Sequence, residues 1–191
     1  MKRKINLLIL TDFPNTILRN CIKKMIRNFE VKINVSELDD VRINISNKDS
    51  KIWQSNYDVI IIWSDLSKVS NEYKKAIYLE KFNRTKLMKD VSSFVQSIKE
   101  ISGVTNYLIF NNWIQNTNYK GYGFFDLKYN LGTRNLLEQL NIKVSKLVYK
   151  SNNIIQYDLN NLFSKTDKNI FNEKSYYLTK VPFTNDAFKN F

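Results

Sequence analysis

The fold is decided by residues 57–65, whose sequence is YDVIIIWSD. Five consecutive apolar residues, Val59 to Trp63, follow Asp58 and end at Ser64 and Asp65. A continuous apolar run of this length is typical of a strand that is buried on both faces of a parallel sheet. Because a sheet of this kind needs helices on both sides, the stretch predicts an α/β protein.

The remaining segments continue this pattern along the chain. Further strands are expected at 4–10, 31–35, 104–110 and 154–157. Apolar residues recur at helical spacing in 17–26, 70–102 and 127–148, and Gly103 ends the second of these helical segments. The alternation of strands and helices predicts right-handed crossovers and a three-layer sandwich around a five-stranded parallel sheet.

The segments between these elements carry weaker signals. Residues 36–56 are expected to be irregular and anchored by Ile43, Ile45, Ile52 and Trp53. Residues 114–125 read as a polar loop, and a short helix is expected near 160–163. A further helix is expected to begin at 184–186, where Thr, Asn and Asp favour a helix start.

The chain of 191 residues has the length of one ordinary domain, so 1–191 is expected to fold as a single unit. Its longest apolar runs are far shorter than the roughly 20 residues that cross a bilayer, so no membrane span is expected. The single cysteine, Cys21, cannot form an internal disulfide and falls on the apolar side of a predicted helix. This cysteine usage fits a reducing compartment and a cytoplasmic location.

A net charge of +12 raises the question of an acidic partner. The lysines are scattered along the chain and interleaved with Asp and Glu, and a bias towards Lys, Asn and Ile accounts for much of the charge. Nucleic acid is therefore disfavoured as a partner, although a basic nucleic-acid-associated domain stays as one alternative function.

The absence of histidine excludes several kinds of site. A Ser-His-Asp triad needs an imidazole base, and a zinc cluster needs more His or Cys ligands than one cysteine supplies. The sequence also contains no Walker A motif and no dinucleotide-binding glycine motif. We therefore expect neither a metal nor a cofactor.

Polar side chains follow most of the predicted strands at the points where these strands end. In an open parallel sheet, ligands bind beyond the carboxyl ends of the strands. Such residues also cap helices and turns, which is the alternative interpretation of each one. As a group they are the candidate binding and catalytic residues: Thr11, Asp12, Ser64, Asp65, Asn111, Asn112 and Asp158.

Four segments carry a resemblance to a known family: 8–13 (LILTDF), 57–63 (YDVIIIW), 135–137 (NLL) and 177–184 (YLTKVPFT). In this order they resemble the SGNH/GDSL hydrolase fold and, within it, the N-terminal domain of FkbH-like, HAD-type proteins. The resemblance implies a flavodoxin-like or SGNH-hydrolase-like sandwich that precedes a HAD-type catalytic domain in a larger protein. It also implies a role in acyl or glyceryl transfer for polysaccharide or secondary-metabolite biosynthesis, with a small acyl or sugar substrate and an acidic acyl-carrier protein as a further partner.

The sequence departs from that family pattern at the catalytic positions. Phe13 stands where the hydrolases have their nucleophilic Ser, and Lys180 and Val181 lie where they have Asp-x-x-His. A serine nucleophile needs a base to accept its proton, so the resemblance predicts a degenerate site that binds without catalysis.

A divergent esterase or acyltransferase is the second reading of the same residues. It would use Thr11 or Ser64 as nucleophile, with Asp12 or Lys180 in the place of the histidine. A lysine base would need its pKa lowered by burial.

Overall fold

The computed structural model describes residues 3–36, 39–115, 119, 121–164, 170–184 and 187–188. Its centre is a five-stranded sheet formed by β1 (Lys4–Thr11), β2 (Glu30–Val35), β3 (Tyr57–Trp63), β4 (Thr105–Asn111) and β5 (Ile154–Tyr157). Every pairing is parallel, and the strand order is β2-β1-β3-β4-β5. The predicted five-stranded parallel sheet is confirmed, and its order is the flavodoxin-like one.

The pairing of β1 with β3 forms the middle of the sheet and explains the continuous apolar runs. The two strands run in register from Leu7 opposite Val59 to Thr11 opposite Trp63. Successive side chains point to opposite faces of a strand, so an apolar residue at every position supplies both faces. Leu8 and Ile60 accordingly pack into the core on one face, while Ile9 packs into the core on the other.

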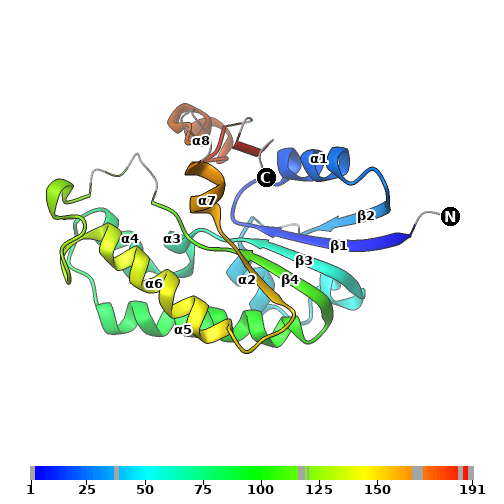
Figure 1. Cartoon of the computed structure of the whole chain (residues 1–191), viewed down its shortest axis with the longest axis horizontal. Helices are drawn as coiled ribbons and strands as arrows, with labels where there is room; N and C mark the ends of the chain where they lie inside the picture. Colours follow the sequence, from blue (N-terminus) through cyan, green and yellow to red (C-terminus); the bar gives the residue numbers. More distant parts are fainter. Residues whose placement is uncertain are drawn as a thin grey trace.

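Helices cover both faces of the sheet (Figure 1). One face packs against α2 (Val41–Ser46), α3 (Leu66–Val69), α4 (Asn71–Ile77), α5 (Arg84–Ser102) and α6 (Thr133–Val148). The other face packs against α1 (Thr16–Met25), α7 (Leu159–Ser164) and the chain around α8 (Glu173–Thr179). Two short 3-10 turns, Lys51–Gln54 and Gly123–Phe125, complete the elements. None of the helices in these described ranges is long and apolar enough to cross a membrane.

Several boundaries and anchors differ from the sequence-based expectation. Residues 41–46 form a helix where an irregular segment was expected, because the Asp40 carboxylate caps it by accepting the Ile43 N–H at 2.9 Å. Ile43 is 51% exposed and therefore anchors nothing, whereas Ile45 is buried as expected.

Two helix predictions also need correction. The helix expected from residue 127 begins only at Thr133, and α8 occupies a stretch that carried no helix prediction. Of the helix start expected at 184–186, residues 185 and 186 lie outside the described residues.

The C-terminal segment is tied to the sheet by an aromatic cluster. The Phe183 ring lies 5.1 Å from Trp63, 5.8 Å from Phe13 and 5.7 Å from Phe163, measured between ring centroids. Phe183 is also a bridge partner of Phe171, so residues 170–184 fold back onto the face that carries α1.

We predict that Phe183→Ala lowers the free energy of unfolding by about 3–5 kcal/mol, because it empties the centre of this cluster. Urea denaturation measures the effect. Phe124→Ala is the matched control, since the Phe124 side chain is fully exposed and its truncation should change stability by less than about 0.5 kcal/mol. Equal effects of the two variants would contradict the packing described here.

Candidate functional site

A cavity of about 170 Å³ lies beyond the carboxyl ends of β1, β3 and β4. The chain leaves β1 towards α1 on one face of the sheet and leaves β3 towards α3 on the other, so the connections diverge at this point. A crevice at such a divergence is where open α/β sheets bind ligands. Of the sequence-predicted residues, the cavity brings together Asp12, Ser64, Asp65, Asn111 and Lys180.

Asp12 joins three segments around the cavity. Its Oδ1 accepts the Val41 N–H at 2.8 Å, and its Oδ2 accepts the Asp65 N–H at 2.7 Å. The Asp12 side chain thus links the end of β1 to the starts of α2 and α3.

Burial raises the pKa of Asp12 to about 7, and Asp65 adds a smaller effect in the same direction. The two backbone N–H groups and the Lys68 ammonium act against this rise. With both oxygens occupied by backbone donors, Asp12 is placed to hold the strand ends together rather than to take a proton from a substrate.

Ser64 is held by two partners on the β4 side. Its backbone N–H donates to Asn111 Oδ1 at 2.7 Å, and Asn111 Nδ2 donates back to the Ser64 carbonyl at 3.1 Å. The Ser64 Oγ accepts the indole N–H of Trp113 at 3.1 Å. An indole N–H is a donor only, so this neighbour cannot accept the serine proton.

Thr11 and Phe13 lie at the end of β1 but contribute no reactive group to the cavity. The Thr11 side chain is fully buried, and its hydroxyl donates to the Phe13 carbonyl at 2.5 Å. The Phe13 ring packs edge-on against Trp63 with centroids 5.4 Å apart. An aromatic side chain therefore fills the position at which the resemblance led us to expect a nucleophilic Ser.

Asn112 and Asp158 are separate from the cavity and lie at a neighbouring surface hollow beside α6. Asn112 Nδ2 donates to Asp158 Oδ1 at 2.8 Å, and Asn112 Oδ1 accepts the Leu159 N–H at 2.8 Å. The two side chains thus fasten β4 to the start of α7, in keeping with the capping interpretation.

Two lysines lie at the mouth of the cavity. Lys68 Nζ donates to the backbone carbonyls of Asp12 and Asp39 at 2.7 and 2.6 Å. Lys180, which has a left-handed backbone at φ 60°, places its ammonium 5.7 Å from the centre of the Tyr176 ring. The Lys180 side chain is exposed to solvent.

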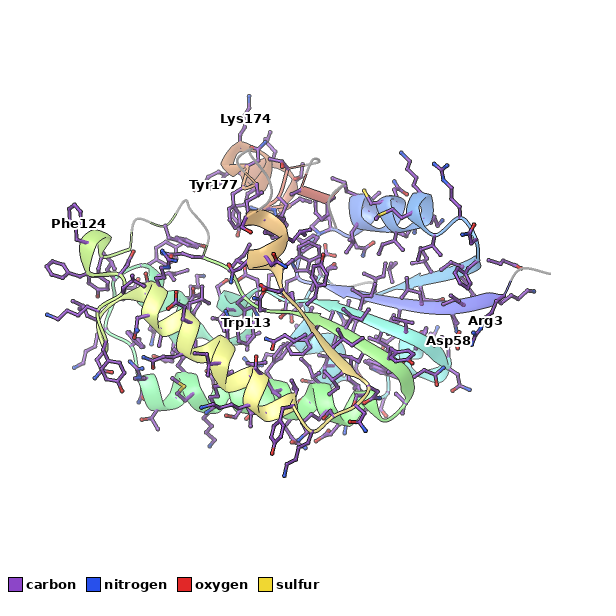
Figure 2. The ribbon with its side chains drawn as sticks, viewed as in Figure 1. Arg3, Asp58, Trp113, Phe124, Lys174 and Tyr177 are labelled. Carbon is purple, nitrogen blue, oxygen red and sulfur yellow. The ribbon has the colours of Figure 1, made fainter. Side chains whose placement is uncertain are left out.

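Aromatic side chains form much of the cavity wall, and sequence reasoning did not assign them to a site. Tyr73 comes from α4, Trp113 follows β4, and Tyr176 comes from α8. Figure 2 shows Trp113 below α7 and α8, and Tyr177 on α8. In the sequence these residues have only the pattern of buried or loop aromatics. Tyr73 and Tyr176 line one cavity although they lie about a hundred residues apart in the chain, and only the fold shows this.

Within the described ranges, no group of three or more His, Cys, Asp or Glu side chains is arranged to hold a metal ion.

The sequence of residues 6–191 matches the family model described as FkbH, N-terminal domain. The chain belongs to this family. No protein of curated function matches this chain.

Solved structures share the fold of this FkbH domain. The N-terminal part of BF1531 from Bacteroides fragilis, which contains a phosphatase domain complexed with Mg, has a TM-score of 0.79 at 22% identity. The comparison covers 98% of the present chain and 49% of that chain, so the FkbH domain spans about half of the BF1531 structure.

Two hydrolases are similar at lower identity. Axe2, an acetylxylan esterase from Geobacillus stearothermophilus, has a TM-score of 0.59 at 10% identity, with 99% of this chain and 91% of Axe2 covered. LAE5, an α/β hydrolase from the metagenome of Lake Arreo, has a TM-score of 0.59 at 7% identity, with 100% and 92% covered. The SGNH-hydrolase-like fold expected from the sequence is confirmed.

The Axe2 variants described as catalytic mutants replace a serine, an aspartate and a histidine. The FkbH domain contains no histidine, so it shares the scaffold of Axe2 without that set of residues.

We predict that Asp12→Asn lowers the free energy of unfolding by about 1–3 kcal/mol, because the amide NH₂ replaces one oxygen and then faces a backbone donor. Asp40→Asn is the matched control, since an asparagine oxygen can still cap α2 and the cost should be near zero. Urea denaturation of both variants measures the difference.

The Asp12→Asn variant should also change how stability depends on pH. The folded chain keeps the Asp12 proton up to about pH 7, whereas the unfolded carboxyl loses it near its ordinary value of 3.8. The Asp12 contribution therefore makes the free energy of unfolding fall as pH rises between these values, and Asp12→Asn should lack that part of the slope. An unchanged slope would contradict the raised pKa.

Proposed function

We propose that this FkbH N-terminal domain binds a ligand at the strand-end cavity and does not hydrolyse it. The ligand would be a small acyl or sugar group handled during acyl or glyceryl transfer in polysaccharide or secondary-metabolite biosynthesis. One observation carries the proposal: the Ser64 hydroxyl, which lines the cavity, accepts the indole N–H of Trp113, and among the described residues it has no hydrogen bond to a base.

The surroundings of Ser64 support a binding role. A serine becomes a nucleophile when an adjacent group accepts its proton. Asp12 accepts backbone N–H groups with both carboxylate oxygens, and the Lys180 ammonium lies over the Tyr176 ring at the exposed mouth. Neither residue is placed as the base that the esterase reading requires.

We propose that a HAD-type catalytic domain carries out the reaction while the present domain binds the ligand. Membership of the FkbH N-terminal family supports an association of this kind, and the similar BF1531 structure contains a phosphatase domain within the same chain. The net charge of +12 also suits contact with an acidic acyl-carrier protein, because complementary charge steers association.

The proposal predicts no hydrolysis of p-nitrophenyl acetate above the rate of the buffer, measured by release of nitrophenol. Ser64→Ala should leave this background unchanged, and so should Lys180→Ala. Ester turnover that disappears in Ser64→Ala would contradict the proposal and support the divergent esterase instead.

A further inference from the structure

Tyr73 lines the cavity, and its hydroxyl is available to a ligand there. The Tyr73 side chain is only 6% exposed and lines the cavity. Among the described residues, none forms a hydrogen bond with its hydroxyl. A ligand in the cavity can therefore form a hydrogen bond with this hydroxyl without displacing a protein partner.

Asp65 offers a complementary acceptor in the same cavity. Its Oδ1 accepts the Ser67 N–H at 2.8 Å, and its other carboxylate oxygen accepts no hydrogen bond from a described residue. The Asp65 charge is close enough to raise the pKa of Tyr73, after the larger effect of burial. The Tyr73 hydroxyl therefore stays protonated at neutral pH and can both donate and accept.

Three other polar side chains of the cavity already have partners. Both carboxylate oxygens of Asp12 accept backbone N–H groups, and the Asn111 amide is bonded to the backbone of Ser64. Lys68 donates to two backbone carbonyls. A ligand can therefore engage Tyr73 and Asp65 without breaking the hydrogen bonds that Asp12, Asn111 and Lys68 form with other described residues.

Charges of both signs line the cavity, namely the side chains of Asp12, Asp65, Lys68 and Lys180. An anion would be repelled by the two carboxylates and a cation by the two ammonium groups, so a neutral ligand meets the least repulsion. Trp63 and Trp113 line the same cavity and offer apolar contact to the C–H groups of a ligand.

We propose that the cavity binds a neutral hydroxylated ligand, a sugar or a polyol, with one hydroxyl donating to Asp65 and accepting from Tyr73. The inference rests on the proposed function, because it names the class of ligand for the same non-hydrolytic site.

Tryptophan fluorescence tests the inference, because Trp63 and Trp113 line the cavity. The probes are methyl β-D-xylopyranoside for the sugar and glycerol for the polyol, with sodium acetate and tetramethylammonium chloride as charged probes. We expect the fluorescence to change in a saturable way with at least one of the two hydroxylated probes. Tighter binding of the xyloside would indicate a sugar ligand, and tighter binding of glycerol would indicate a polyol.

The variants then locate the binding. Tyr73→Phe removes only the hydroxyl and should weaken binding about tenfold, and Asp65→Asn, which keeps the cap of α3, should weaken it by a similar or larger factor. Tyr107→Phe is the matched control, because Tyr107 is exposed on β4 and does not line the cavity. Its affinity should equal that of the unchanged protein.

Three results would overturn the inference: no saturable response to either hydroxylated probe, preferential binding of a charged probe, or equal affinity of Tyr73→Phe and Tyr107→Phe. These results leave the ester hydrolysis assay unaffected. Ser64-dependent ester turnover, in contrast, would refute the proposed function while a Tyr73-dependent affinity for sugar could still hold, so the two failures are distinguishable.

Discussion

The site depends on one carboxylate, that of Asp12. Its two oxygens hold the Val41 and Asp65 backbone N–H groups at 2.8 and 2.7 Å, so one side chain fixes where β1 ends and where α2 and α3 begin. Hydrogen bonds to a charged group contribute about 1.5–3 kcal/mol each, more than a typical neutral bond. We call Asp12 with these two hydrogen bonds the Asp12 clamp. Burial raises the pKa of the Asp12 carboxyl to about 7, so the charged form of the clamp is disfavoured by desolvation and its protonation changes near neutral pH.

Because both carboxylate oxygens of Asp12 accept backbone N–H groups, this side chain is not placed to act as a base in the cavity. Phe13 packs edge-on against Trp63 in the wall of the cavity and offers no nucleophile, and the Ser64 Oγ accepts the indole N–H of Trp113, which cannot act as a base. At the strand ends of this fold, which is shared with hydrolases, lies a cavity with aromatic walls. Such a cavity is suited to holding a ligand for a partner domain, which is the role we propose.

The sequence predicted the sheet because continuous apolar runs such as 57–63 leave few alternatives to a doubly covered parallel strand. It also placed Asp12, Ser64, Asp65 and Asn111 at a shared edge, since parallel strands end on the same side. The sequence could not show that Asp158 lies outside this cavity. That outcome depends on the direction of its side chain, which accepts a hydrogen bond from Asn112. In the sequence, Tyr73 occupies a position that is expected to lie on the apolar face of a helix. Only the tertiary structure shows that this residue also lines the cavity.

The most direct test of the Asp12 clamp is an NMR pH titration of the Val41 and Asp65 backbone amides. The clamp predicts that both amide resonances shift together, with one midpoint near the Asp12 pKa of about 7, and that neither shows this titration in Asp12→Asn. Two different midpoints, or a titration that persists in Asp12→Asn, would contradict the claim that one carboxylate joins these strand ends.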